Sequence, residues 1–106
     1  MNLSFQSLRD ANIARVTDYE SMPGGIDTWN PLEWAGALGG EAGELLNKCK
    51  KLRRGEDVPL EAIAEEIADV VIYADLVAAR FRLDLAAEVA KKFNVVSERI
   101  GSKVRL

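Results

Sequence analysis

The apolar residues of this chain recur at helical spacing, and no stretch shows the alternation expected of a β-strand. A first helix is predicted from about Ser4 to Asp18. The residues along one side of this helix are Phe5, Leu8, Asn12, Val16 and Tyr19. A loop through Met-Pro-Gly-Gly at 22–25 then separates it from the next helical segment.

The second helix has a well-defined start. Asn30 is a good N-cap, Pro31 suits the first helical position, and Glu33 can complete a capping box. The helix should run to about Arg53 and end at Gly55.

Two further helices complete the pattern. The third is predicted from near Pro59 to about Arg82, and the fourth follows the N-cap Asp84 and ends near Gly101. We therefore expect one all-α domain over residues 1–106, resembling a four-helix bundle with short connections.

The third helix has almost no polar face. Its apolar residues are Ile63, Ala64, Ile67, Ala68, Val70, Val71, Ile72, Ala74, Leu76, Val77, Ala78 and Ala79. A helix that is apolar all round must be covered all round, and a domain of this size has few elements to do it. We therefore expect a homo-oligomer, in which a symmetry mate supplies the missing cover.

Two pairs of carboxylates stand out: Glu41 with Glu44, and Glu66 with Asp69. Each pair has i, i+3 spacing, so both acids lie on one helix face. At about 100° per residue, Glu41 borders the apolar arc of its helix, and Glu66 and Asp69 are embedded in apolar surface. Because a buried carboxylate needs a partner, two such helices face to face would favour a bound cation.

The composition narrows the identity of that cation. The chain has 106 residues and no histidine, which excludes His-ligated zinc, Ser-His-Asp and Cys-His catalysis, and Glu-x-x-His di-iron sites. A metal must then be held by oxygen, the ligand that Mg²⁺ prefers. Spacing alone leaves an alternative open, in which the acids form ordinary ion pairs with Lys48, Lys50, Lys51, Arg53 and Arg54.

The remaining composition argues against several classes of partner. A net charge of −3 does not favour nucleic-acid binding, and no long uncharged apolar run suggests a membrane span. The N-terminus lacks the features of a signal peptide, and the single Cys49 permits no internal disulfide, so we expect a cytoplasmic protein.

Three glycines and one further acid favour structural roles. Gly39, Gly40 and Gly43 precede no G-K-[ST] and form no phosphate loop, so we expect them to allow close helix approach at the site or at a subunit contact. Asp75 lies opposite Glu66 on the helical wheel, and we expect it to pair across an oligomer interface.

The order E-x-x-E, 21 residues, E-x-x-D resembles the signature of the MazG-like, all-α nucleoside triphosphate pyrophosphohydrolases. LGGEAGELLNKCKKLRRGE at 38–56 and EEIADVVIYADLVAARFRLDL at 65–85 resemble the two helix motifs of that family. KKFNVVSERIGSKV at 91–104 resembles the C-terminal segment of its small members. The likeness covers about residues 29–104.

The resemblance implies hydrolysis of a (deoxy)nucleoside triphosphate between the α and β phosphates, as clearance of unwanted nucleotides. The metal would be Mg²⁺, or Mn²⁺, held by Glu41, Glu44, Glu66 and Asp69, with a carboxylate such as Glu44 taking the proton from water. Small members form dimers or dimers of dimers. The base is not specified, and we favour deoxynucleotides, with dCTP as the first choice.

Six residues are candidate substrate contacts under this resemblance. Lys48 lies one turn beyond Glu44 and can reach a phosphate, as can Lys51; the alternative is a solvated basic helix end. Tyr73, one turn after Asp69, would contact base or sugar or serve the core. Trp29 would stack on a base or staple the helix start. Lys92 and Asn94 would reach substrate, also across a subunit boundary.

Two competing hypotheses remain at this stage. One is a non-catalytic helical oligomerisation module whose acids form ion pairs. The other keeps the fold and acts on a phosphoribosyl-nucleotide of histidine synthesis, which the Trp29 region and the KKFN segment make less favoured.

Overall fold

The computed structural model describes residues 2–106, and these form four α-helices and one short 3₁₀ helix, with no strand among them. The elements are α1 (Phe5–Val16), η1 (Gly25–Asp27), α2 (Pro31–Arg53), α3 (Leu60–Arg80) and α4 (Leu85–Ile100). The predicted all-α class is therefore confirmed.

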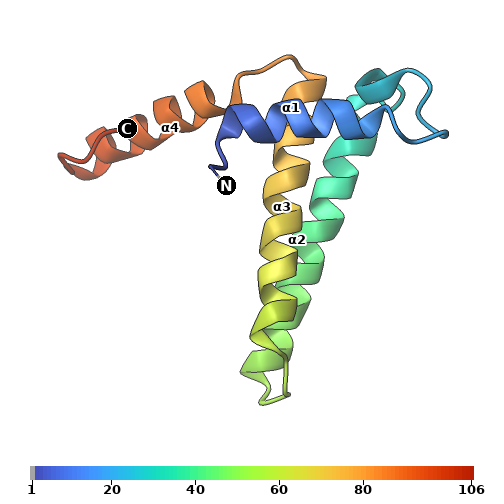
Figure 1. Ribbon diagram of the computed structural model, residues 1–106. Coiled ribbons are helices and arrows are strands. Elements are labelled where there is room, and N and C mark those ends of the chain that lie inside the picture. Colours follow the sequence, from blue (N-terminus) through green and yellow to red (C-terminus); the bar gives the residue numbers. More distant parts are fainter. Residues whose placement is uncertain (1) are drawn as a thin grey trace.

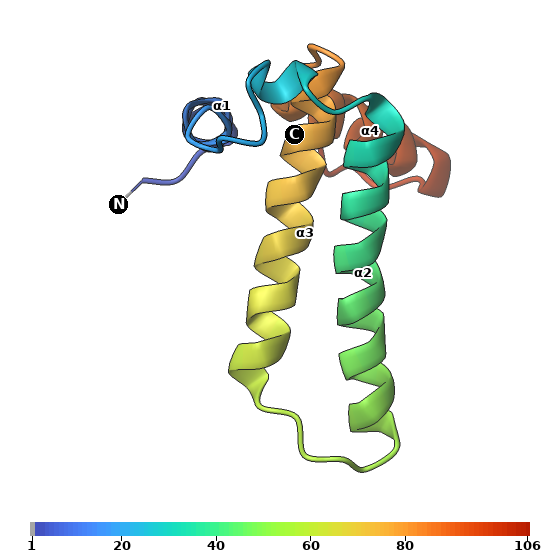
Figure 2. The same ribbon diagram turned by 90° about the vertical axis from the view of Figure 1, so that its right-hand side faces the viewer.

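A long hairpin of α2 and α3 dominates the molecule (Figures 1 and 2). The two helices run antiparallel, side by side, while α1 lies across the upper end of the hairpin. From that same end α4 extends away, and it contacts α1 and α3 but not α2. The hairpin thus carries both acidic pairs on adjacent helices.

The helix boundaries follow from their capping residues. Asn30 Oδ1 accepts from the Glu33 backbone N–H at 2.8 Å, and Glu33 Oε1 accepts from the Asn30 N–H at 3.0 Å. Asp84 caps α4 by accepting from the Ala87 N–H at 3.2 Å, and Gly101 ends that helix with φ 73°. The predicted starts and ends are confirmed to within a few residues, because caps satisfy orphan groups locally.

The core lies at the junction where α1, η1, α2 and α3 meet. Its buried apolar residues are Val16, Met22, Ile26, Trp34, Leu76 and Ala79. Trp34 is only 2% exposed, and its indole N–H donates to the Ile26 carbonyl at 2.9 Å. This bond anchors the loop before α2 to the start of that helix.

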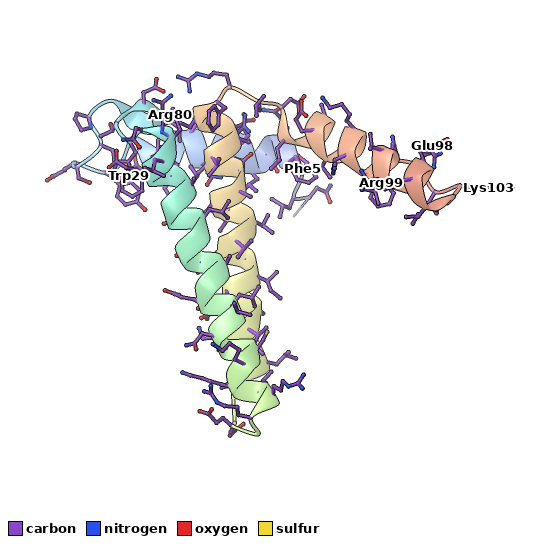
Figure 3. The ribbon with its side chains drawn as sticks, turned by 180° about the vertical axis from the view of Figure 1, so that it is seen from behind. Phe5, Trp29, Arg80, Glu98, Arg99 and Lys103 are labelled. Carbon is purple, nitrogen blue, oxygen red and sulfur yellow. The ribbon has the colours of Figure 1, made fainter. Side chains whose placement is uncertain are left out.

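Trp29 stands at the same junction, near Arg80 in Figure 3. Its ring lies 4.6 Å from that of Trp34 between centroids, and its carbonyl accepts from Arg80 Nε at 2.8 Å. Trp29 precedes the N-cap and Trp34 is the fourth helical residue, which is the arrangement of a hydrophobic staple. The stapling role expected as one alternative for Trp29 is confirmed.

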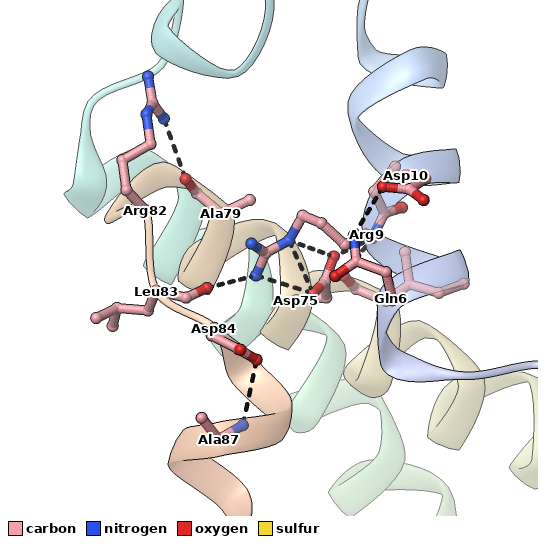
Figure 4. A network of polar contacts seen from close by, with 11 residues as sticks. Gln6, Arg9, Asp10, Asp75, Ala79, Arg82, Leu83, Asp84 and Ala87 are labelled. Atoms are coloured by element: carbon pink, nitrogen blue, oxygen red, sulfur yellow. Dashed lines mark hydrogen bonds and ion pairs between the residues drawn. The ribbon is translucent and has the colours of Figure 1, made fainter.

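The expectation that Asp75 pairs across an oligomer interface is wrong. Asp75 is fully buried within the chain and is bound by residues of α1 (Figure 4). Arg9 Nε donates to both carboxylate oxygens, at 3.1 and 3.2 Å, and Asn12 Nδ2 donates to one of them at 2.9 Å. Arg9 also donates to the Leu83 carbonyl at 2.9 Å. The pair therefore fastens α1 to the end of α3.

One side of α3 has no cover from residues 2–106. Ile67 and Val71 are 50% and 45% exposed, and Leu46 of α2 is exposed as well. A Cβ built on Gly36, Gly39, Gly40 or Gly43 would meet no described atom within 4 Å. Among residues 2–106, then, these glycines lie at no close helix contact, and a role at a subunit contact stays a prediction.

Among residues 2–106, no helix has the length and apolar character needed to cross a membrane.

Candidate metal centre

Three of the four predicted acids meet between α2 and α3. Glu41, Glu66 and Asp69 each place one carboxylate oxygen within 4.8 Å of the others. The antiparallel packing of the hairpin brings Glu41 opposite the α3 pair, and the i, i+3 spacing puts Glu66 and Asp69 on one face. We call these three residues the acidic triad.

Glu66 is the most enclosed member of the acidic triad, with 6% of its surface exposed. The Lys48 ammonium donates to its Oε1 and forms an ion pair with it. Its Oε2 is buried and has no hydrogen-bond partner among residues 2–106. A buried carboxylate oxygen without a donor is costly, so this atom marks a position for a cationic or N–H ligand.

The expected alternative of ordinary ion pairs is therefore found at one acid. Lys48 from α2 neutralises Glu66, as that alternative required. Neither Glu41 nor Asp69 has an ion-pair partner in the part of the chain that the structure describes. One lysine thus faces three carboxylates, and the acidic triad keeps an excess of negative charge.

The pKa shifts reflect this excess. Burial raises the pKa of Glu41, and the neighbouring carboxylates of Asp69, Glu44 and Glu66 raise it further. The hydrogen bond from Lys48 lowers the pKa of Glu66 against the opposing effect of burial. The same bond raises the pKa of Lys48, so the lysine stays charged at neutral pH.

Glu44, the fourth predicted acid, lies outside the acidic triad. Its side chain is exposed, one turn along α2 from Glu41. It is near enough for its charge to raise the pKa of Glu41. Its position leaves it in contact with solvent at the edge of the site.

The donor set fits a hard divalent cation. Three carboxylates and no nitrogen or sulfur ligand form the acidic triad, and Mg²⁺ is bound by oxygen at about 2.1 Å in octahedral geometry. Oxygens on opposite sides of such an ion are about 4.2 Å apart, so small side-chain movements bring the triad into range. The buried Glu66 Oε2, which has no donor among residues 2–106, is available for such an ion.

A cavity of about 440 Å³ adjoins the acidic triad through Asp69. Trp29, Trp34 and Tyr73 give it aromatic walls, and α1 with the following loop adds Arg15 and Tyr19. Burial raises the pKa of Tyr73, with a further contribution from the Glu41 charge, so its hydroxyl stays protonated at neutral pH. Trp29 and Tyr73, both predicted from sequence, thus line a cavity beside the acids.

Arg15 was not anticipated as a site residue. It lies in the last turn of α1, where a basic side chain is expected for its interaction with the helix dipole, so its sequence position gave no sign of a pocket. Only the crossing of α1 over the hairpin brings it to the cavity.

Among the residues that the structure describes, the remaining predicted contacts do not converge on the acidic triad. Lys51 is half-buried one turn from Lys48 near the far end of α2. Lys92 and Asn94 are on α4, which does not contact α2. Asn94 binds the backbone of Leu106, donating to its carbonyl at 3.0 Å and accepting from its N–H at 2.8 Å.

Comparison with known proteins assigns no family: no family model matches the chain, and neither curated proteins nor solved structures give a significant match. The resemblance to the MazG-like enzymes therefore stays a prediction.

Proposed function

We propose that this protein is a Mg²⁺-dependent nucleoside triphosphate pyrophosphohydrolase of the MazG-like type. It would hydrolyse the bond between the α and β phosphates and release a monophosphate and pyrophosphate. The observation that carries the proposal is the acidic triad between α2 and α3, with a buried Glu66 oxygen that has no protein donor in residues 2–106.

Glu41, Glu66 and Asp69 would hold the ion, with Mn²⁺ as a substitute for Mg²⁺. When bound, a divalent ion neutralises phosphate charge and lowers the pKa of a coordinated water. Glu44 is solvent-exposed one turn from Glu41, and it would accept a proton from the attacking water. Lys48 and Lys51 supply the positive charges for the phosphate chain.

The aromatic cavity beside Asp69 supports a nucleotide as the substrate. Its volume of about 440 Å³ suits a base and part of a sugar, and Trp29 and Tyr73 offer flat apolar surfaces. Arg15 and Tyr19 supply polar groups at its edge. We propose deoxynucleotides as the preferred class, with dCTP as the first candidate.

A second copy of the chain would complete the molecule. The exposed side of α2 and α3, with Leu46, Ile67 and Val71, is apolar and is the surface for a dimer or a dimer of dimers. Assembly would also determine whether Lys92 and Asn94 approach the acids of a partner. A reducing, cytoplasmic location suits the free and exposed Cys49.

The proposal is tested by incubating the purified protein with ribo- and deoxynucleoside triphosphates and Mg²⁺. We expect equimolar monophosphate and pyrophosphate, with the deoxynucleotides turned over faster and no product when a chelator removes the metal. Products are separated by anion-exchange chromatography. Release of single phosphates, or no turnover of any nucleotide, would contradict the proposal.

The ion pair of Lys48 with Glu66 favours a second candidate. In a non-catalytic oligomerisation module, that pair would serve only to join α2 to α3. The two candidates differ in the same assay, because a module would release no product from any nucleotide while still forming oligomers.

A further inference from the structure

The Lys48 ammonium is bound to Glu66, the most enclosed acid of the proposed metal centre. It donates to Glu66 Oε1, while Glu66 Oε2 remains buried without a donor in residues 2–106. Glu41 and Asp69 each place a carboxylate oxygen within 4.8 Å of that carboxylate, and neither has an ion-pair partner among the same residues. A single positive charge is thus held where three negative charges converge.

The two partners differ in their freedom to move. Glu66 is 6% exposed and fixed in the α2–α3 contact, whereas the Lys48 side chain is 29% exposed at the edge of the hairpin. Lysine carries its charge on a flexible four-carbon stem and accepts a change of partner readily. The lysine can therefore leave toward solvent, while the carboxylate stays in place.

A divalent cation at the acidic triad would share the Glu66 carboxylate with this ammonium. Two cations on the oxygens of one carboxylate repel each other in a partly desolvated site, so a divalent ion on one oxygen weakens the hold of the other on the ammonium. The orphaned Oε2 is the atom that an incoming ion would take first.

We infer that Lys48 is a built-in counter-ion of the acidic triad, which stands in for the divalent cation in the metal-free protein and must leave Glu66 when the cation binds. This inference rests on the metal centre of the proposed function and adds an exchange of cations to that centre. Once displaced, the ammonium lies one turn beyond Glu44 and is available to an anionic group on the bound ion. Metal binding and phosphate binding are then coupled through one side chain.

The exchange predicts that removing the Lys48 charge strengthens metal binding. Lys48→Met keeps an unbranched side chain of similar length without the charge, and Lys50→Met is the matched control, since Lys50 is exposed on the same helix. In calorimetric titrations of the full chain with Mn²⁺ and no nucleotide, we expect roughly tenfold tighter binding for Lys48→Met, between the values for exposed and buried ion pairs. Lys50→Met should match the wild type within about twofold, as expected of an exposed charge.

A thermal measurement provides a second readout. Without metal, Lys48→Met should melt below the wild type, because Glu66 loses its counter-ion, and saturating Mn²⁺ should raise its melting temperature more than that of the wild type. If Lys48→Met does not fold, Lys48→Gln keeps a donor for Glu66 without the charge and should also bind Mn²⁺ more tightly than the wild type.

The Mn²⁺ titrations distinguish a failure of the cation exchange from a failure of the metal centre. Unchanged or weaker Mn²⁺ binding in Lys48→Met and Lys48→Gln, with normal binding by the wild type, would overturn the cation exchange and leave the metal centre standing. Absence of Mn²⁺ binding in the wild type and in the Lys48 variants would overturn the metal centre together with the exchange.

Discussion

Replacing Glu66 by Gln or Asp69 by Asn is expected to reduce pyrophosphate release roughly a thousandfold. A catalytic metal ion supplies several kcal/mol of transition-state stabilisation, and each 1.4 kcal/mol or so corresponds to a factor of ten in rate. Both substitutions keep the shape of the side chain and remove the charge that would hold the ion. The rate is measured as pyrophosphate formed from the best nucleotide of the panel at saturating Mg²⁺.

Glu61→Gln is the matched control for these variants. Glu61 is an exposed acid in the first turn of the same helix, away from the acidic triad. It should keep near wild-type turnover, and circular dichroism should show that all three variants retain their helices. If Glu66→Gln and Asp69→Asn were as active as Glu61→Gln, the acidic triad would not be the catalytic centre.

Truncating Asp75 is expected to have the largest effect on stability. Asp75→Ala leaves the Arg9 guanidinium without its buried acceptor (Figure 4). The Asn12 amide loses the same acceptor. Removing one partner of a buried ion pair costs about 3–5 kcal/mol, and a domain of this size has about 5–15 kcal/mol in total. We expect a loss of this size in urea unfolding at fixed protein concentration, and detachment of α1 from the hairpin.

Two further variants decide whether the buried pair is the cause. Asp10→Ala removes an exposed acid of α1 that is bonded to Gln6, and should change the free energy of unfolding by less than about 0.5 kcal/mol. The double variant Arg9→Met with Asp75→Leu replaces both charges by apolar groups and should lose less than Asp75→Ala alone. A loss below about 1 kcal/mol in Asp75→Ala would show that the pair does not hold α1 in place.

The helix boundaries could be predicted from sequence because their determinants are local. Asn30 with Glu33 starts α2, Asp84 starts α4, and Gly101 ends it, each through bonds to residues within one turn. The burial of Glu66 was also predictable, since the apolar residues around it on the helical wheel lie on its own helix. Neither inference required knowledge of how the helices pack.

Contacts between segments that are distant in the sequence could not be predicted from it. Asp75 is bound by Arg9, 66 residues away, and nothing on the wheel of α3 distinguishes an acid paired with α1 from one facing a second subunit. The position of Arg15 in the lining of the aromatic cavity could not be predicted either, because it depends on the crossing of α1 over the hairpin. These features depend on the tertiary arrangement of separate helices.

For Lys48, the sequence predicted a position near the acids, and the structure identified its partner. Helical spacing placed its charge near the acids and suggested a phosphate contact. The packing of α2 on α3 adds that the lysine binds Glu66 directly. Under the proposed cation exchange, this residue would serve both purposes in turn, as a counter-ion without metal and as a phosphate ligand with it.

Anomalous diffraction from crystals containing Mn²⁺ decides whether the acidic triad is a divalent-metal site. We expect a peak at about 2.1 Å from carboxylate oxygens of Glu41, Glu66 and Asp69, with the Lys48 ammonium displaced from Glu66. No peak between these carboxylates at saturating Mn²⁺, with Lys48 still bound to Glu66, would contradict it.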